Sequence, residues 1–401
     1  MTTFKSTLLA GATLLLTLGA SNPGYAQADS YDQEYDVDSG GTLMLRSDSG
    51  PITVRTWDQE RVRVRIRNAE DFEVSLEQRG DDVVVVAEAE RRGGIFGFRT
   101  SNIQFDVDVP EAYNVDLDTG GGSISVEDIS GDVTADTSGG SIEIGNVTGV
   151  VTADTSGGRI NIGDVDGDVS ADTSGGNIEI GNVTGDVSAD TSGGRITIGN
   201  VGGDMLADTS GGNITVGQGS GRVQLDTSGG TIRAAWALGP VIADTSGGNI
   251  YLEGSETSVE ADTSGGNIEI ERSGGAVTAD TSGGSITIRQ AVGPIRADTA
   301  GGRIDAELAA FSGSRDATVE LETAGGDVTL RIPGGHNASI VADLEVSRRA
   351  RGDYRIYTDF PLTINEDDDG NIIARGDING GGDRIYLETV NSDIHIVSTG
   401  N

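Results

Sequence analysis

A column of aspartates holds the residues of this sequence best placed to do chemistry. The block Asp-Thr-Ser-Gly-Gly recurs every 18 residues between 136 and 302, with Ala in place of Ser in the last copy. If each repeat is one coil of a stack, these carboxylates lie about 4.8 Å apart, and adjacent charges repel by about 1 kcal/mol in water. The aspartates of this column are Asp136, Asp154, Asp172, Asp190, Asp208, Asp226, Asp244, Asp262, Asp280 and Asp298.

Two kinds of partner could offset the repulsion within this column. The carboxylates could accept hydrogen bonds from corner amides and from Thr or Ser hydroxyls, as aspartate does in Asx-turns. Alternatively, divalent cations such as calcium could bridge neighbouring carboxylates. The sequence lacks the Gly-Gly-x-Gly-x-Asp nonapeptide of calcium-binding β-rolls. We therefore expect structural capping, with a calcium ladder as the alternative and no other cofactor.

The elements that must position this column follow from the residues around it. Val133 and Ala135 alternate with polar residues, as do Ile142 and Ile144, which predicts two short strands with one buried face each. Residues 137–140 supply the corner between them, where we expect glycine to adopt positive φ. A short third side closes the coil, and the fixed period predicts that successive coils stack in parallel.

Weaker copies of the repeat extend the predicted stack toward both ends of the chain. Segment 47–54 lies five periods before the coil of Asp136, and segment 388–396 lies 14 periods after it. The sequence therefore predicts an all-β, single-stranded parallel β-solenoid with 18-residue coils and irregular β caps at both ends. The expected divisions are a signal peptide (1–28), an N-terminal cap with hairpins and first degenerate coils (29–115), a regular solenoid (116–334), and C-terminal degenerate coils with a cap (335–401).

The first 28 residues have the three parts of a secretory signal peptide. Lys5 gives a positive start, Leu8 to Leu18 form a short apolar core, and Ala26-Gln27-Ala28 is an Ala-x-Ala cleavage site. The apolar run is too short to span a membrane, and no other segment approaches the necessary length. We therefore expect an exported protein without a transmembrane segment, in the periplasm, at the cell surface or outside the cell.

The composition argues against two classes of partner. The chain has 64 acidic and 27 basic residues, a net charge of −37, and no cysteine. So acidic a surface repels nucleic acid and anionic membranes. Because disulfides are excluded, stability must come from the stacking of coils.

One basic stripe departs from this acidic background. Arg61, Arg63, Arg65 and Arg67 alternate along a predicted strand and point to one face. Such a stripe could bind an anion, but acidic residues in the segment 70–77 and in the following strands offer cross-strand partners. We therefore expect an ion-paired surface here.

Several segments resemble the bacterial DUF4097 family of adhesins. The resemblance rests on Ser49-Gly50-Pro51-Ile52-Thr53-Val54-Arg55-Thr56-Trp57-Asp58, on Phe105-Asp106-Val107-Asp108-Val109-Pro110, on the Thr-Ser-Gly-Gly-x-Ile-x-Ile coils and on Asp327-Val328-Thr329-Leu330-Arg331-Ile332-Pro333. It implies a single-stranded, right-handed β-solenoid at the cell surface or in the periplasm, and it implies no catalytic residues.

An enzyme is the rival class, because some β-solenoids cleave polysaccharides with carboxylates beside a loop-walled cleft. The coils between 118 and 302 carry no long insertion that could wall a cleft, and the only histidines are His336 and His395. We therefore expect no enzyme.

Ice binding is a third class. It would use the threonine column that starts at Thr137, but it needs two outward threonines per coil, and only one recurs.

The function expected from the sequence is that of an exported, non-enzymatic adhesin, or of a surface or periplasmic binding and spacer module. Its partner would be a polysaccharide or a cell-surface protein, held by many weak contacts along a repetitive face. The alternatives are a polysaccharide-active β-helix enzyme and a divalent-cation-binding structural protein. A column of outward amides and guanidiniums could bind sugars or simply stabilise the stack: Asn177, Arg195, Asn213, Asn249, Asn267 and Arg303.

Overall fold

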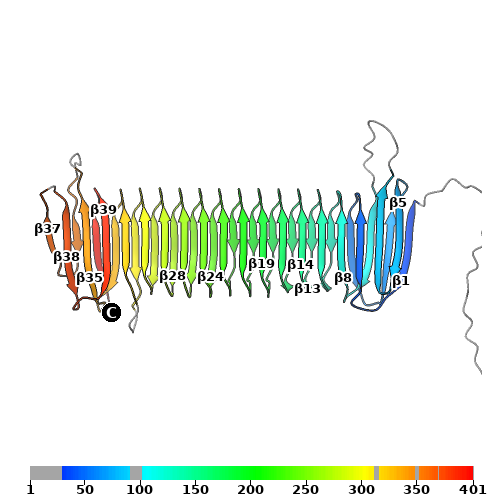
Figure 1. Ribbon diagram of the computed structural model, residues 1–401, viewed down its shortest axis with the longest axis horizontal. Coiled ribbons are helices and arrows are strands. Elements are labelled where there is room, and N and C mark those ends of the chain that lie inside the picture. The colour runs from blue at the N-terminus through cyan, green and yellow to red at the C-terminus, as the bar shows by residue number, and fades with distance from the viewer. Residues whose placement is uncertain (1–28, 91–101, 311–315, 348–351, 369, 401) are drawn as a thin grey trace, which may run out of the picture.

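The computed structural model describes residues 29–90, 102–310, 316–347, 352–368 and 370–400; the predicted signal peptide, 1–28, lies outside them. The described chain forms a long rod in which the strands run across the long axis (Figure 1). Within these residues every regular element is a β-strand, which confirms the predicted all-β solenoid. No described helix has the length and hydropathy needed to cross a membrane.

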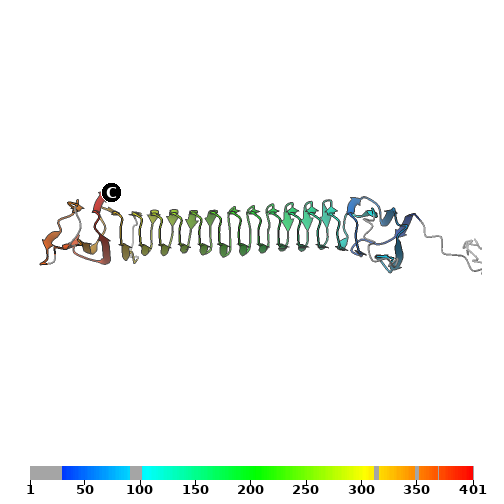
Figure 2. The ribbon, with the colours of Figure 1, turned by 90° about the horizontal axis from the view of Figure 1, so that it is seen from above.

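Two long sheets face each other along the rod (Figure 2). The Asp sheet, which carries the aspartate column, contains the first strand of each coil: β8 (Asn114–Thr119), β11 (Val133–Thr137), β14 (Val151–Thr155), β17 (Val169–Thr173), β19 (Val187–Thr191), β21 (Met205–Thr209), β23 (Val223–Thr227), β25 (Val241–Thr245), β27 (Val259–Thr263), β29 (Val277–Thr281), β31 (Ile295–Thr299) and β33 (Val319–Thr323). The Ile sheet contains the second: β9 (Ile124–Val126), β12 (Ile142–Ile144), β15 (Ile160–Ile162), β18 (Ile178–Ile180), β20 (Ile196–Ile198), β22 (Ile214–Val216), β24 (Ile232–Ala237), β26 (Ile250–Ser255), β28 (Ile268–Ser273), β30 (Ile286–Ala291), β32 (Ile304–Leu308) and β34 (Val328–Pro333).

The regular coils pair in parallel and in register. Val133 lies beside Val151 and Asp136 beside Asp154, an offset of 18 residues that recurs up to β31. The next pairing, of Asp298 with Glu322, absorbs the six-residue insertion. Inward and outward positions alternate as predicted: Ile178 is 1% exposed, while its neighbour Glu179 faces solvent. The handedness of the winding stays a prediction.

A buried threonine closes the corner after each Asp-sheet strand. Thr173 is fully buried, and its Oγ1 donates to the Gly158 carbonyl of the preceding coil at 2.8 Å. The Gly176 amide in turn donates to Thr173 Oγ1 at 3.3 Å. The hydroxyl-to-carbonyl bond recurs in neighbouring coils, for example from Thr155. Since these threonines are buried, the structure excludes the outward threonine face that ice binding requires.

The corner glycines are required for a reason other than the predicted one. None of the Thr-Ser-Gly-Gly glycines has positive φ. Instead the second glycine meets the preceding corner: a Cβ on Gly176 would lie 1.9 Å from the Gly158 carbonyl oxygen. The first glycine has room, because a Cβ on Gly175 would come no closer than 3.6 Å to its surroundings. Close approach of coils, and not a left-handed turn, therefore fixes the second glycine.

A third side exists in only part of the rod, although the repeat predicted it for every coil. Strands β10 (Ile129–Ser130), β13 (Val147–Thr148) and β16 (Val165–Asp166) form it, and single bridges continue it through Val183 and Val201 to Gly219. From β24 onward the second strand lengthens from three residues to five or six and takes up this segment. The three-sided coils thus occupy the N-terminal half of the regular solenoid.

Both ends depart from the sequential order that the weak repeat copies predicted. Strand β2 (Thr42–Ser47) pairs with both β6 (Asp82–Ala89) and β8, and β3 (Ile52–Trp57) pairs with both β7 (Gln104–Pro110) and β9. At the other end β39 (Asp383–Val390) lies between β33 and β35 (Ala338–Glu345). Likewise β40 (Ile394–Thr399) lies between β34 and β36 (Ile356–Thr358). The first coil, β2 and β3, therefore lies between segments that come later in the chain. The last coil, β39 and β40, lies between segments that come earlier.

Antiparallel strands complete the two caps. At the N-terminal end these are β1 (Ser30–Asp36), β4 (Arg61–Arg67) and β5 (Phe72–Arg79); at the C-terminal end they are β37 (Thr363–Glu366) and β38 (Ile372–Ile378). The parallel stack would otherwise end in open edges able to pair with other chains.

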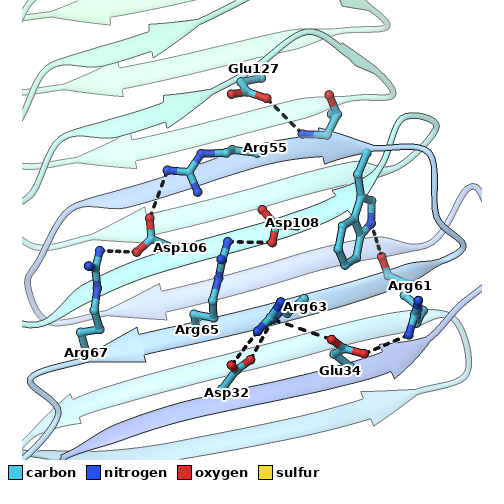
Figure 3. Close-up of polar contacts among 12 residues, drawn as sticks. Asp32, Glu34, Arg55, Arg61, Arg63, Arg65, Arg67, Asp106, Asp108 and Glu127 are labelled. Atoms are coloured by element: carbon cyan, nitrogen blue, oxygen red, sulfur yellow. Dashed lines mark hydrogen bonds and ion pairs between the residues drawn. The ribbon is translucent and has the colours of Figure 1, made fainter.

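The arginine stripe on β4 is ion-paired, as predicted, with partners on a following strand, β7, and on the preceding strand β1 (Figure 3). Arg63 contacts Asp32 at 2.7 Å, Arg65 contacts Asp108 at 2.7 Å, and Arg67 contacts Asp106. These acids come from the neighbouring strands β1 and β7, and not from segment 70–77, because β5 belongs to the other sheet. The stripe therefore joins the cap strands through ion pairs.

The buried corner hydroxyl gives a direct test of the stack. Thr173→Val keeps the shape of the side chain but leaves the Gly158 carbonyl without its donor, which should cost about 1–3 kcal/mol of unfolding free energy. Thr152→Val on the exposed face of β14 is the matched control and should change little. Denaturant unfolding of both variants measures the difference; equal losses would show that the hydroxyl bond does not hold the coils together.

Candidate functional site

The aspartate column lies where the sequence predicted it, on the outer face of the Asp sheet. Its members pair coil by coil, from Asp136 beside Asp154 to Asp280 beside Asp298. In the described part of the chain, none of these ten carboxylates accepts a hydrogen bond; only Asp118, one coil earlier, has a partner, Arg46. The expected Asx-type capping is therefore wrong, because the threonine hydroxyls occupy the corners instead.

Burial and neighbouring carboxylates raise the pKa of several aspartates in the column. Partial burial between coils raises the pKa of Asp154 above its usual value, and the neighbouring carboxylates of Asp172 and Asp136 raise it further. The same causes, in the same order, raise the pKa of Asp208 and of Asp244. The column therefore costs the folded rod stability at neutral pH.

The described residues contain no group of three or more His, Cys, Asp or Glu side chains arranged to hold a metal ion. Calcium bridging between neighbouring column members stays a prediction. Melting in calcium and in sodium at matched ionic strength is its direct test, since general screening acts equally in both.

A groove with a volume of about 960 Å³ runs along the third side of the regular coils. Its floor is made by the inward-turning residues of the third side, such as Val147 and Val165. Thr56 and Glu111 close its N-terminal end. One wall consists of Asp128, Asn146, Asp164, Asn182, Asn200 and Gln218; the other consists of Ser130, Thr148, Asp166, Thr184, Gly202 and Ser220.

Hydrogen bonds between coils fix the first wall. The side-chain oxygen of each wall residue from Asp128 to Asn200 accepts the backbone N–H one coil further on, as Asn146 does from Asp164 at 2.9 Å and Asn182 from Asn200 at 3.0 Å. The Asn182 amide nitrogen also donates to Asp164 at 3.1 Å. The second wall is partly tied as well, since the Thr184 hydroxyl donates to Asp166 at 2.7 Å. These side chains are thus held in place before any ligand arrives.

The groove offers amides, hydroxyls and carboxylates at a constant spacing, and no basic side chain lines it. Carboxylates such as Asp164 and Asp166 make it unfavourable for anions. An array of fixed donors and acceptors suits an uncharged ligand rich in hydroxyl groups. The groove therefore favours a neutral polar polymer lying along the rod axis.

The asparagines in the column of amides and guanidiniums bond along the stack. Asn177 accepts the backbone N–H of Arg195 at 2.9 Å, and Asn249 accepts that of Asn267 at 2.8 Å. This is the stack-stabilising ladder that the sequence offered as one of two explanations.

Sequence reasoning missed the groove. Its signal was present, because Asp or Asn precedes the third-side isoleucine or valine in each coil from 128 to 200. Asn146 and Asn182 also stand in Asn-Val-Thr sequences, which recur with the repeat and so do not by themselves indicate a binding site. The alternation of residues predicts which side chains face outward. It does not specify how the three sides of the coil meet, and the hollow depends on that.

The chain matches no known family model, and no curated protein is significantly similar to it. It is similar to a solved "putative cell adhesion protein" from Clostridium sporogenes at 8% identity and a TM-score of 0.15, over 92% of this chain and 100% of that one. A "putative lipid binding protein" from Parabacteroides distasonis matches at 14% identity and a TM-score of 0.25, over 73% and 96%.

A "putative adhesin" from the same organism, Parabacteroides distasonis, matches at 14% identity and a TM-score of 0.21, over 74% of this chain and 98% of that one. Identities and TM-scores this low do not place the chain in a family with any of these proteins.

The crowded aspartates predict an unusual pH dependence. Because the pKa of Asp154 is higher in the folded rod than in the unfolded chain, the folded state binds a proton at this carboxylate more tightly, so stability should rise as pH falls from neutrality toward the ordinary pKa of aspartate. Further acidification should reverse the trend, because the Arg63 side chain lowers the pKa of Asp32 and that pairing is lost on protonation.

Asp154→Asn isolates the contribution of the column. The variant should melt higher than the wild type at neutral pH and gain less on mild acidification. Glu143→Gln, which removes one exposed carboxylate from the Ile sheet, is the control. Thermal melting at constant ionic strength decides; equal pH profiles for wild type and Asp154→Asn would contradict the crowding.

Proposed function

We propose that this chain is an exported, non-enzymatic binding module whose third-side groove holds a stretch of neutral polysaccharide. The observation that carries the proposal is the groove itself: successive coils present the same kinds of fixed polar side chain along one straight line. A polymer with repeating hydroxyl groups can contact all of them at once. Many weak contacts then add to a useful affinity.

The stacked coils favour a polymer over a small ligand. The groove has no lid or side loop among its lining residues, so a short ligand would remain largely open to water. A long chain compensates by extending over several coils. Rigidity helps here, because the wall side chains lose little additional freedom on binding.

Binding without turnover is part of the proposal. Glycoside cleavage commonly uses one protonated and one ionised carboxyl group on opposite sides of the bond. In the groove, Asp128 and Asp164 accept backbone N–H groups from the next coil at 2.7 Å, so both carboxyl groups already serve the stack. A cell-surface protein is the second candidate partner, favoured by the flat, repetitive outer faces of the sheets.

Export and surface placement follow from the predicted signal peptide and remain part of the proposal. The acidic rod would stay soluble and would be repelled by nucleic acid and anionic membranes. It would therefore act outside the cytoplasm as an adhesin or spacer that recognises uncharged chains.

Blocking the groove tests the function. Thr148→Arg places a long side chain in the groove without removing a hydrogen bond, and it should weaken binding of neutral polysaccharides by about tenfold. Thr134→Arg, on the exposed face of the Asp sheet, is the matched control and should bind like the wild type. Binding to a panel of neutral and acidic polysaccharides is measured by calorimetry, with product analysis for cleavage. Cleavage of any polysaccharide, or equal binding by both variants, would overturn the proposal.

A further inference from the structure

Two aromatic rings interrupt the otherwise aliphatic and polar surface of the regular coils. Among the described residues from 114 to 334, Trp236 and Tyr251 are the only aromatic side chains. They lie in successive coils on β24 and β26 of the Ile sheet, where the strand is lengthened. Both are partly exposed. A deviation this local in a strict repeat needs an explanation beyond stacking.

The guanidinium group of an arginine packs over each ring. The Cζ atom of Arg233 lies 4.7 Å from the centroid of the Tyr251 ring, and that of Arg272 lies 4.7 Å from the centroid of the Trp236 ring. Such cation–π contacts hold a guanidinium flat and leave the N–H groups at its edge free to donate. In the register of the Ile sheet, the column of Arg233 and Tyr251 lies three positions along the strand from the column of Trp236, Gly254 and Arg272.

Glycine makes the second pair possible. Gly254 stands between Trp236 and Arg272 in the register, so these two residues belong to coils that are not adjacent. A Cβ on Gly254 would lie 3.1 Å from the Trp236 ring and 1.7 Å from the Arg272 carbonyl oxygen. Its φ of +123° also suits glycine. The indole can therefore lie across the intervening coil and reach the guanidinium.

The two arginines have no carboxylate partner in the described chain, although the protein has a large excess of acids. The nearby Glu269 and Glu271 both form salt bridges with Arg289, and the Glu269 contact measures 2.8 Å. Counting Arg233, Arg272 and Arg289 against Glu253, Glu269 and Glu271, this part of the face is electrically balanced. It thus differs from the acidic surface around it.

This surface adjoins the C-terminal end of the groove. Gln218 and Ser220 are the last residues to line the groove. Between them, the Gly219 amide donates to the Trp236 carbonyl at 3.3 Å, and the Leu238 amide donates to the Gly219 carbonyl at 2.8 Å. A chain leaving the groove along the rod axis would therefore pass onto the coil of Trp236.

We propose that Arg233, Trp236, Tyr251 and Arg272 form a second sugar-binding site, which takes a neutral hexopyranose unit of the polysaccharide that lies in the groove. This site rests on the function proposed above and extends it. A pyranose has an apolar C–H face and an edge of hydroxyl groups. The exposed parts of the two rings contact the face, and the free N–H groups of the guanidiniums donate to neighbouring hydroxyls. The charge balance, with Glu253 on the same face, and the acidic rod around it disfavour uronates.

Calorimetric titration of the full mature chain tests this site. The probes are neutral hexasaccharides of glucose, galactose, mannose and N-acetylglucosamine, together with a galacturonate hexasaccharide. Trp236→Ala, Tyr251→Ala and the double variant Arg233→Gln/Arg272→Gln should each weaken binding of the best neutral probe by about tenfold. Arg296→Gln, on the Asp sheet, removes the same charge as one arginine of the pair and should leave affinity unchanged. Melting temperatures confirm that each variant is folded.

The outcomes separate the two proposals. Weaker binding by all three patch variants, with Arg296→Gln unaffected, supports the second site. If the patch variants bind as the wild type does while Thr148→Arg fails, the second site is overturned and the groove stands. If galacturonate binds more tightly than every neutral probe, the neutral specificity is overturned. If no probe binds the wild type, the proposed function itself falls.

Discussion

The bond from a buried threonine hydroxyl to the glycine carbonyl of the preceding coil is the constraint on which this rod depends. It places one coil over the next at a single register, as from Thr173 to Gly158 at 2.8 Å. The second corner glycine allows the approach, because a side chain there would collide with the carbonyl below. A slip by one residue would turn every inward side chain outward. The corner therefore fixes the register for both sheets at once.

The same constraint determines what the surface can offer. Identical positions fall in columns, so a charged residue in the repeat becomes a line of like charges, and a polar one becomes a line of fixed donors or acceptors. The aspartate column shows the cost, since burial and neighbouring carboxylates raise the pKa of Asp154. The groove shows how such a column can serve binding, since Asn146 and Asn182 accept hydrogen bonds from the next coil and still face solvent. Where the repeat is broken, as at Trp236, the surface gains a local identity.

Much of this could be predicted from the sequence, because strand alternation and an 18-residue period are local properties. Ile178 faces inward and Glu179 outward as their spacing indicates. The prediction failed where the outcome depends on contacts between coils. Asp136 has an Asx-turn sequence, yet Thr137 takes the corner; Gly140 has a turn sequence, yet it serves close packing. The irregular caps were predicted correctly, but the order of the outer coils was not, because sequence similarity to the repeat does not specify which coil lies beside Ser47; its neighbours are Ala87 and Thr119.

Removing one whole coil tests the central claim, that an in-register stack of 18-residue coils holds the molecule together. Deletion of residues 172–189 joins Ala171 to Asp190 and leaves every remaining residue in register. Deletion of 172–188 leaves one extra residue and shifts all coils beyond it. Denaturant unfolding should show that the first protein keeps nearly the stability of the wild type, while the second loses most of it. Equal destabilisation by the two deletions would contradict the account.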